Sequence, residues 1–173
     1  MQKQAPHRKM QKQQKENKPF IDLYNIIKYF ILWILFTLIA YGIRLIVLAA
    51  INISPTHQVG NGILTLYEVH NTGAAFNLFA GNTETIISLS FIAIAALTFV
   101  ILIASTKLSN AIVTAMAVLS GGITMNLVER IQQRYVIDYI HCNFLPNFPV
   151  FNFADILVVV GSICLVLAII TRK

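Results

Sequence analysis

The sequence predicts an all-α integral membrane protein with four transmembrane helices and a small extracytoplasmic β-element in its first outer loop. The first observation is composition: 57% of the 173 residues are hydrophobic and only 12% are charged, whereas soluble domains carry about 25% charged residues. The second is a set of four long apolar stretches, and the third is the distribution of Lys and Arg between the loops. This composition leaves too little polar surface for a water-soluble globule.

Residues 1–28 are predicted to form a basic cytoplasmic tail, followed by a membrane domain at 29–173. Six of the 13 Lys and Arg lie in the first 19 residues, against the single acid Glu16. Such a Gln-rich polar segment cannot bury apolar surface and is typical of a disordered tail. Its charge favours the cytoplasm and contact with anionic lipid. Because no aromatic residues alternate with the charges, nucleic acid is not an expected partner.

Four apolar stretches match the length of about 20 residues that a helix needs to cross a bilayer. We expect the helices at about 29–51, 85–106, 108–128 and 154–171. A tight turn around Lys107 separates the second helix from the third. The first stretch is too long for a cleaved signal peptide, and no A-x-A site follows it.

The loops differ in their content of Lys and Arg, which sets the expected orientation. The segment 52–84 contains neither residue, and the segment 129–153 contains only Arg130 and Arg134. We therefore expect both termini in the cytoplasm and both long loops outside. The polar side chains of the outer loops make that face the place to look for chemistry.

The first outer loop contains a β-rich stretch at 63–69, bounded by Gly62 and by the turn residues 71–73. It forms either an ordinary hairpin or a small sheet at the membrane surface that shelters a bound chain. The small residues Gly73 and Ala74 allow another backbone to approach closely.

The end of the third helix is both tightly packed and polar. Gly121 and Gly122 allow close contact between helices. Asn126 and Arg130 lie four residues apart and so share one helix face. They are either interfacial anchors or part of a site.

Two acids lie at the same apolar boundary. Asp155 could close a capping box with Asn152, and Asp138 could pair with Arg134 on the surface. However, a helix over 156–171 is about 24 Å long, which places Asp155 at the outer edge of the hydrocarbon, where an ionisable residue indicates function. Two neighbouring carboxyl groups that share a proton are what an aspartyl protease requires.

Four motifs in this order resemble the lipoprotein signal peptidases, the type II signal peptidases of bacteria. They are NTGAAF at 71–76, GGxxxNxxER at 121–130, VIDYI at 136–140 and FPVFNFAD at 148–155. The resemblance implies a multi-pass aspartyl protease of the bacterial inner membrane with its active site at the outer, periplasmic face. Such an enzyme removes the signal peptide from a prolipoprotein just before a cysteine that carries diacylglycerol.

The resemblance also assigns roles to single positions. Asp138 and Asp155 match the catalytic dyad of the family. The positions that match its substrate-binding residues are Asn71, Gly73, Ala74, Asn126, Arg130, Asn152 and Ala154. The implied partners are a lipid-modified prolipoprotein and membrane lipid, and no metal or cofactor is implied, because two carboxyl groups and a water suffice.

Some positions depart from the family pattern. Glu129 stands where Asp is usual, and Met125 and Arg134 stand where Gly is usual. In the first helix Ala40 replaces an acid and Arg44 replaces Lys. These changes put in doubt a salt link to the first helix, but they do not affect the two acids.

Other protein classes fit less well. A zinc protease needs a ligand cluster such as H-E-x-x-H, and a serine intramembrane protease needs Gly-x-Ser-Gly, which 118–121 lacks. The remaining alternative is a small transporter or assembly factor that uses Asp138 and Asp155 to bind protons or cations. A transporter would place its acids near the midplane and show internal repeats, and the sequence shows neither.

Overall fold

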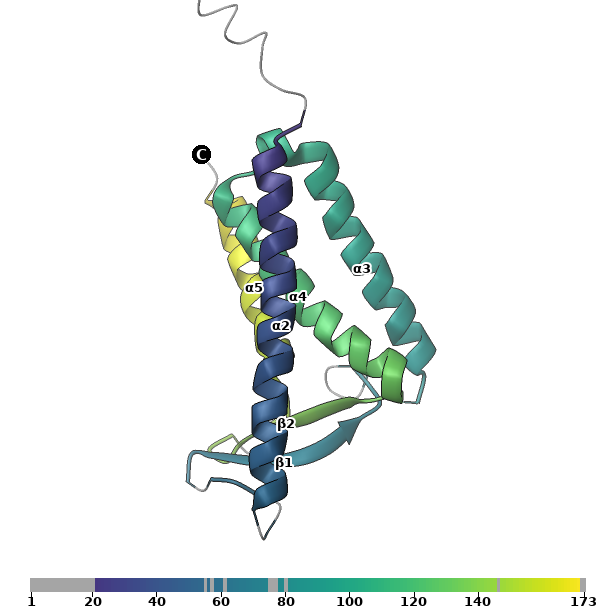
Figure 1. Ribbon diagram of the computed structural model, residues 1–173, viewed down its shortest axis with the longest axis vertical. Coiled ribbons are helices and arrows are strands. Elements are labelled where there is room, and N and C mark those ends of the chain that lie inside the picture. Colours follow the sequence, from purple (N-terminus) through teal and green to yellow (C-terminus); the bar gives the residue numbers. More distant parts are fainter. Residues whose placement is uncertain are drawn as a thin grey trace, which may run out of the picture.

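The chain forms a bundle of four long helices with a two-stranded sheet at one end, as the computed structural model shows (Figure 1). The structure describes residues 21–54, 56, 58–60, 62–74, 78–79, 81–145 and 147–171. The elements are α2 (Leu23–Ile53), β1 (Leu64–Asn71), α3 (Thr83–Ala104), the 3-10 helix η2 (Ser105–Lys107), α4 (Asn110–Gln133), β2 (Val136–Cys142) and α5 (Phe153–Ile170). In this part of the chain, four helices are long and apolar enough to cross a membrane. The predicted fold class is therefore confirmed.

Each helix begins at a side chain that caps its first turn. The caps are Asp22, Asn82, Ser109 and Asn152, and each accepts a hydrogen bond from a backbone N–H of its helix. Residues of these types favour this position for that reason. The first helix starts at Leu23 and not at the expected Tyr29, because Asp22 supplies a cap ahead of the apolar run. Residues 1–20 of the predicted basic tail lie outside the described residues.

The helix α4 runs past its expected end at 128 and continues to Gln133. Its last turns carry Glu129 and Arg130, which are buried and not exposed at a helix end. The helix stops at Arg134, whose φ of 70° lies in the left-handed region. Glycine favours that conformation, so the expectation of Gly at this position has a structural reason.

Glycines bring α4 into close contact with α2 and with α5. A Cβ added to Gly121 would lie 2.7 Å from Cβ of Phe36, and one added to Gly122 would lie 2.5 Å from the carbonyl oxygen of Ala154. Neither position has room for a larger residue, as is common where membrane helices meet. The predicted role of this glycine pair is confirmed, and Gly122 sets how close the start of α5 lies to α4.

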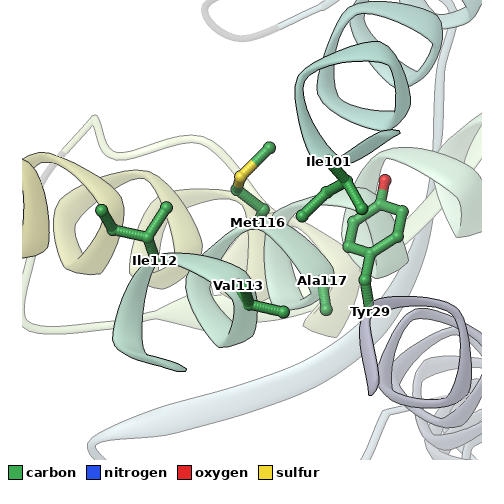
Figure 2. Packing of buried hydrophobic residues seen from close by; sticks show 6 residues of the cluster. All are labelled: Tyr29, Ile101, Ile112, Val113, Met116 and Ala117. Carbon is green, nitrogen blue, oxygen red and sulfur yellow. The ribbon is translucent and has the colours of Figure 1, made fainter. Parts of the chain in front are cut away.

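A hydrophobic cluster joins α2, α3 and α4 at the end of the bundle away from the sheet (Figure 2). Its buried members are Tyr29, Ile101, Ile112, Val113, Met116 and Ala117. The hydroxyl of Tyr29 is hydrogen-bonded to Ser120 Oγ at 2.8 Å. This buried hydroxyl therefore has the partner that a polar group in an apolar interior requires.

The sheet is formed by two strands that lie far apart in the sequence. β1 comes from the first outer loop and β2 from the second, and they pair antiparallel with Val69 opposite Asp138. The small-sheet interpretation of the first loop is thus correct, and of a hairpin within that loop the described residues show one antiparallel bridge, between Val59 and Leu66. An irregularity in register between Leu66 and Val69 forms a bulge, and a further bridge joins Ile140 of β2 to Phe151, just before α5.

The sheet lies at the opposite end of the bundle from the start of α2 and the end of α5 (Figure 1). Along the helices many large apolar side chains are exposed, among them Leu38 at 61%, Ile92 at 63% and Val166 at 54%. Such an apolar outer surface suits contact with lipid chains, while the helical backbone satisfies its own hydrogen bonds.

Candidate active site

Asn152 connects the two acids that the sequence singled out. Asp138 lies in β2 and is 2% exposed, and Asp155 lies in the first turn of α5 and is partly buried. The side-chain Nδ2 of Asn152 donates to Asp138 Oδ1 at 2.8 Å, and its backbone N–H donates to Asp155 Oδ2 at 3.0 Å. One residue thereby holds both carboxyl groups.

Two further asparagines complete the contacts of these groups. Asn71 Nδ2 donates to Asp138 Oδ2 at 2.8 Å, and Asn126 Nδ2 donates to Asp155 Oδ1 at 2.8 Å. The side chain of Asn126 also accepts a hydrogen bond from Asn152 Nδ2 at 3.1 Å. Each of the four carboxyl oxygens therefore accepts one N–H, which compensates for much of the cost of burying them.

The structural alternatives for the two acids have different outcomes. The capping box is present, because Asn152 Oδ1 accepts from the backbone N–H of Asp155 at 3.0 Å. Asp155 therefore closes the capping box of α5 and also belongs to the acid pair. The pairing of Asp138 with Arg134 is wrong, since Arg134 points to the surface and forms an ion pair with Glu84.

Arg130 carries positive charge into the same region. Its Nη2 donates to the carbonyl of Gly73 at 2.8 Å, and its Nη1 donates to the carbonyl of Asn126 at 3.3 Å. Its Nε is buried and has no hydrogen-bond partner among the described residues. The guanidinium thus fixes the Gly73 turn, and its five N–H donors are not all used in these two bonds.

Burial changes the protonation of Asp138. Loss of water around the carboxyl group, followed by the negative charge of Asp155, raises the pKa of Asp138 to about 7. The amides of Asn71 and Asn152 and the charge of Arg130 act in the opposite direction. Near neutral pH this group can therefore both hold and release a proton.

A cavity of about 700 Å³ opens onto both acids. Asn71, Arg130, Asp138 and Asp155 provide its polar end, and Ala74 also lines the cavity. Most of its wall is apolar and comes from β1, from the start of β2, from 148–151 and from α5; these residues include Val69, Val136, Phe148, Pro149, Val150, Phe151, Ile156, Val158, Val159 and Val160. The site therefore combines reactive polar groups with a long apolar surface, as ligand pockets commonly do.

Comparison with known protein families distinguishes the protease from the transporter or assembly factor, the two classes that the sequence left open. The model of the family described as signal peptidase (SPase) II matches residues 32–171. The chain belongs to the signal peptidase II family. The match covers all of the described site, and the resemblance drawn from the four sequence motifs is thereby confirmed.

Curated relatives of this signal peptidase II chain come from several bacteria. The lipoprotein signal peptidase of Dehalococcoides mccartyi is 36% identical over 128 residues, which cover 72% of this chain and 78% of the relative. The lipoprotein signal peptidase of Lactobacillus gasseri is 30% identical over 136 residues, which cover 78% of this chain and 86% of the relative.

Two solved structures share the fold. Both are described as bacterial membrane enzymes studied by the in meso method, and both are 22% identical to this chain. One has a TM-score of 0.71 and covers 82% of this chain and 87% of its own. The other has a TM-score of 0.65 and covers 90% of this chain and 98% of its own.

Nearly all the positions expected to contact substrate lie around the two acids of this signal peptidase II chain. Asn71, Asn126 and Asn152 bind the carboxyl groups, and Arg130 binds Gly73. Ala74 lies at the cavity wall. The exception is Ala154, which packs in the contact between α4 and α5 with its carbonyl against Gly122.

The departures at Arg44 and Glu129 compensate for one another. Arg44 Nε is hydrogen-bonded and ion-paired to Glu129 Oε1, and Glu129 Oε2 accepts from the backbone N–H of Ile137 at 3.2 Å. A salt link to the first helix therefore exists without an acid at Ala40. The sequence signal for this salt link was Arg44, which is the only charged residue in the apolar stretch 29–51.

Sequence reasoning did not identify the strand β2 or the part that Tyr139 plays in it. The hydroxyl of Tyr139 accepts a hydrogen bond from the backbone N–H of Phe153 at 3.2 Å. The run VIDYI is short, apolar and β-branched, which is a usable strand signal.

Within the described part of the chain, no three His, Cys, Asp or Glu side chains are grouped as metal ligands would be.

Proposed function

We propose that this protein is an aspartyl endopeptidase of the bacterial cytoplasmic membrane that processes lipoproteins. It removes the signal peptide from diacylglyceryl-modified prolipoproteins and cuts just before the lipidated cysteine. Asp138 and Asp155 are its catalytic residues. The observation that carries the proposal is the bridge through Asn152, which holds two carboxyl groups side by side at the polar end of an apolar cavity.

The two carboxyl groups divide the chemistry of peptide hydrolysis. Like charges this close do not both ionise readily, so the pair holds one proton near neutral pH. The ionised carboxyl takes a proton from a water, which attacks the scissile carbonyl, and the protonated carboxyl supplies a proton to the leaving amine. The raised pKa of Asp138, about 7, suits a group that must hold and release a proton at physiological pH.

The cavity suits a substrate with a lipid group. Its walls near Phe148 and along α5 from Ile156 are apolar, and burial of acyl chains contributes roughly 0.8 kcal/mol per CH₂. At the polar end, the guanidinium of Arg130 lines the cavity and supplies positive charge and N–H donors next to the two acids.

The active site faces outward in this proposal. Lys28 and Lys107 belong to the end of the bundle opposite the sheet, where Lys28 Nζ contacts Asn110 Oδ1 at 3.2 Å. Cationic residues of short loops favour the cytoplasm, so both chain ends lie inside and the sheet lies at the periplasmic face.

The decisive experiment uses purified protein and a prolipoprotein with and without its diacylglyceryl group. We expect cleavage of the modified precursor and much slower cleavage of the unmodified one. Asp138→Asn and Asp155→Asn keep the shape of the side chains but cannot share a proton. Each should reduce turnover by about 10²–10⁴-fold, and the double variant should be little worse than either single variant.

Glu68→Gln is a suitable control, because it neutralises a surface acid of the same sheet. Equal rates on both precursors would contradict the proposed substrate. A folded Asp155→Asn protein that cleaves at the wild-type rate would return Asp155 to a capping role alone and would contradict the dyad.

Orientation is tested separately with single cysteines at Thr56 and at Lys107, in a protein whose Cys142 and Cys164 are replaced by Ser. In intact spheroplasts an impermeant thiol reagent should label the cysteine at 56 and not the one at 107. The opposite labelling would place the site on the cytoplasmic face and contradict the proposed location.

A further inference from the structure

Tyr139 makes contacts on both sides of Asn152. Its backbone N–H donates to the carbonyl of Phe151 at 3.0 Å, and its hydroxyl accepts from the backbone N–H of Phe153 at 3.2 Å. The two residues that flank Asn152 in the chain are thus both bound by this one residue of β2. Tyr139 itself directly follows Asp138 in the strand.

The location of the hydroxyl is unusual for a residue that serves only to fill space. The ring is 2% exposed and packs with Ile51 and Ile137, where a phenylalanine would pack as well. A buried hydroxyl is costly unless it is hydrogen-bonded, and this one binds a backbone N–H at the start of α5, where helical N–H groups have no partner within the helix.

The surroundings of Tyr139 connect it to the catalytic acids. The charged groups that act on its hydroxyl are Glu129 on α4, Arg44 on α2 and Asp155 on α5. A second, small cavity of about 10 Å³ is lined by Tyr139 together with Asn126 and Asn152. The ring therefore borders the two amides that hold Asp155 and Asp138.

We propose that Tyr139 is a positioning residue, whose hydroxyl fixes the backbone of Phe153 so that Asn152 reaches both acids at once. This inference rests on the proposed aspartyl mechanism and adds a residue to it. The hydroxyl does not touch substrate. It acts by setting the separation between Asp138, which moves with β2, and Asp155, which moves with the start of α5.

The test begins with Tyr139→Phe, which removes only the hydroxyl. We expect kcat on the lipid-modified precursor to fall about tenfold, less than the 10²-fold loss that a 1 Å misplacement can cause, with KM unchanged. Tyr67→Phe is the matched control: it removes a hydroxyl from the partner strand, and Tyr67 lies outside the cavity wall. It should leave kcat unchanged.

A pH profile separates positioning from simple stabilisation. Asp138 is acted on by Asp155 and Arg130 and is bound by Asn71 and Asn152. If Tyr139→Phe loosens the link to α5, Asp155 acts less strongly on Asp138, and water enters. Both effects favour the ionised form of Asp138, and they are larger than the opposite effect of a weaker hydrogen bond from Asn152. The fall in activity at high pH should therefore move to lower pH. A loss of thermal stability with an unchanged profile would overturn the inference.

A double-mutant cycle tests the specific contact. Phe153→Pro removes the N–H that the hydroxyl binds, at the first helical position, where proline is well tolerated. Asn152 is already extended, with φ −124° and ψ 178°, as a residue before proline must be. Phe153→Ala also removes the ring but keeps the N–H, and so serves as the reference.

We expect Tyr139→Phe to lower kcat in the Phe153→Ala protein and to have no further effect in the Phe153→Pro protein. An equal loss in both backgrounds would overturn the inference, because the hydroxyl would then act elsewhere. These outcomes leave the proposed function intact as long as Asp138→Asn and Asp155→Asn remain inactive; activity in those two variants would refute the dyad itself.

Discussion

Arg44 on α2 and Glu129 on α4 form an ion pair inside the bundle, and their side chains are only 18% and 5% exposed. The second oxygen of Glu129 accepts the backbone N–H of Ile137, the residue before Asp138. The pair therefore ties α2 and α4 to the strand that carries one acid of the proposed dyad.

Glu129→Ala should destabilise the protein by about 3–5 kcal/mol, because it leaves Arg44 charged, largely buried and unpaired. Unfolding of the purified protein by denaturant would measure this. The variant Arg44→Met with Glu129→Leu removes both charges and should be markedly more stable than Glu129→Ala. If the double variant is the less stable of the two, an unpaired charge on Arg44 is not the cause of the loss in Glu129→Ala.

Activity should fall as the pH rises above about 7. The pKa of Asp138 is raised to about 7, and the proposed mechanism needs one protonated carboxyl in the pair. Rates of cleavage between pH 5 and 9 on one lipid-modified precursor would show this limb. A rate that keeps rising through pH 9 would contradict a shared proton.

The same group should make stability depend on pH. Its pKa is higher in the folded protein than the usual value near 4, so between about pH 4 and 7 the folded state binds more protons than the unfolded state. The free energy of unfolding therefore decreases as the pH rises through this window. Asp138→Asn should flatten the decrease, whereas Glu68→Gln should leave it as it is.

Much of this architecture could be predicted from the sequence, because helices in lipid must be long, apolar and continuous. Asp138 and Asp155 stood out for a related reason: acids are rare at such a boundary. The pairing of β1 with β2 could not be predicted in this way, since strands 64–71 and 136–142 are brought together by tertiary packing and not by local pattern.

The hydrophobic pattern of the sequence also could not predict the exact ends of the helices or the contacts of single side chains. The third helix continues to Gln133 because burial of Glu129 and Arg130 compensates for their polarity. Neither the bond from Phe153 to Tyr139 nor that from Asn152 to Asp138 follows from residue type, because each depends on where two distant segments meet.

Asn152→Ser should separate the two tasks of this residue. Serine is also a good N-cap, so α5 should still begin at the same place, but the donor to Asp138 is lost. A hydrogen bond to a charged group contributes roughly 1.5–3 kcal/mol, which corresponds to about a 10- to 100-fold loss of kcat. Asn82→Ser, the same change at the cap of α3, should leave kcat unchanged; if both variants lose activity equally, the bridge has no special role.

Gly122→Ala should lower both stability and activity. An added Cβ would lie 2.5 Å from the carbonyl oxygen of Ala154 and 2.9 Å from the backbone nitrogen of Val158, so α5 must move away from α4, at a cost of about 1–3 kcal/mol. Because Ala154 lies between Asn152 and Asp155 in sequence, that movement changes the separation of the two acids of the proposed dyad.

Two other glycines provide the controls for this prediction. Gly161→Ala meets the backbone of Leu119 at 2.7 Å in the same interface, farther along α5, and should lower stability while the folded enzyme keeps its kcat. Gly42→Ala meets nothing within 4 Å and should be neutral or slightly stabilising, since alanine favours a helix by up to about 1 kcal/mol over glycine. Thermal unfolding and cleavage rates per folded molecule would measure both effects. A Gly122→Ala protein that is destabilised but fully active would show that the dyad tolerates movement of α5, contrary to the close positioning proposed through Asn152 and Tyr139.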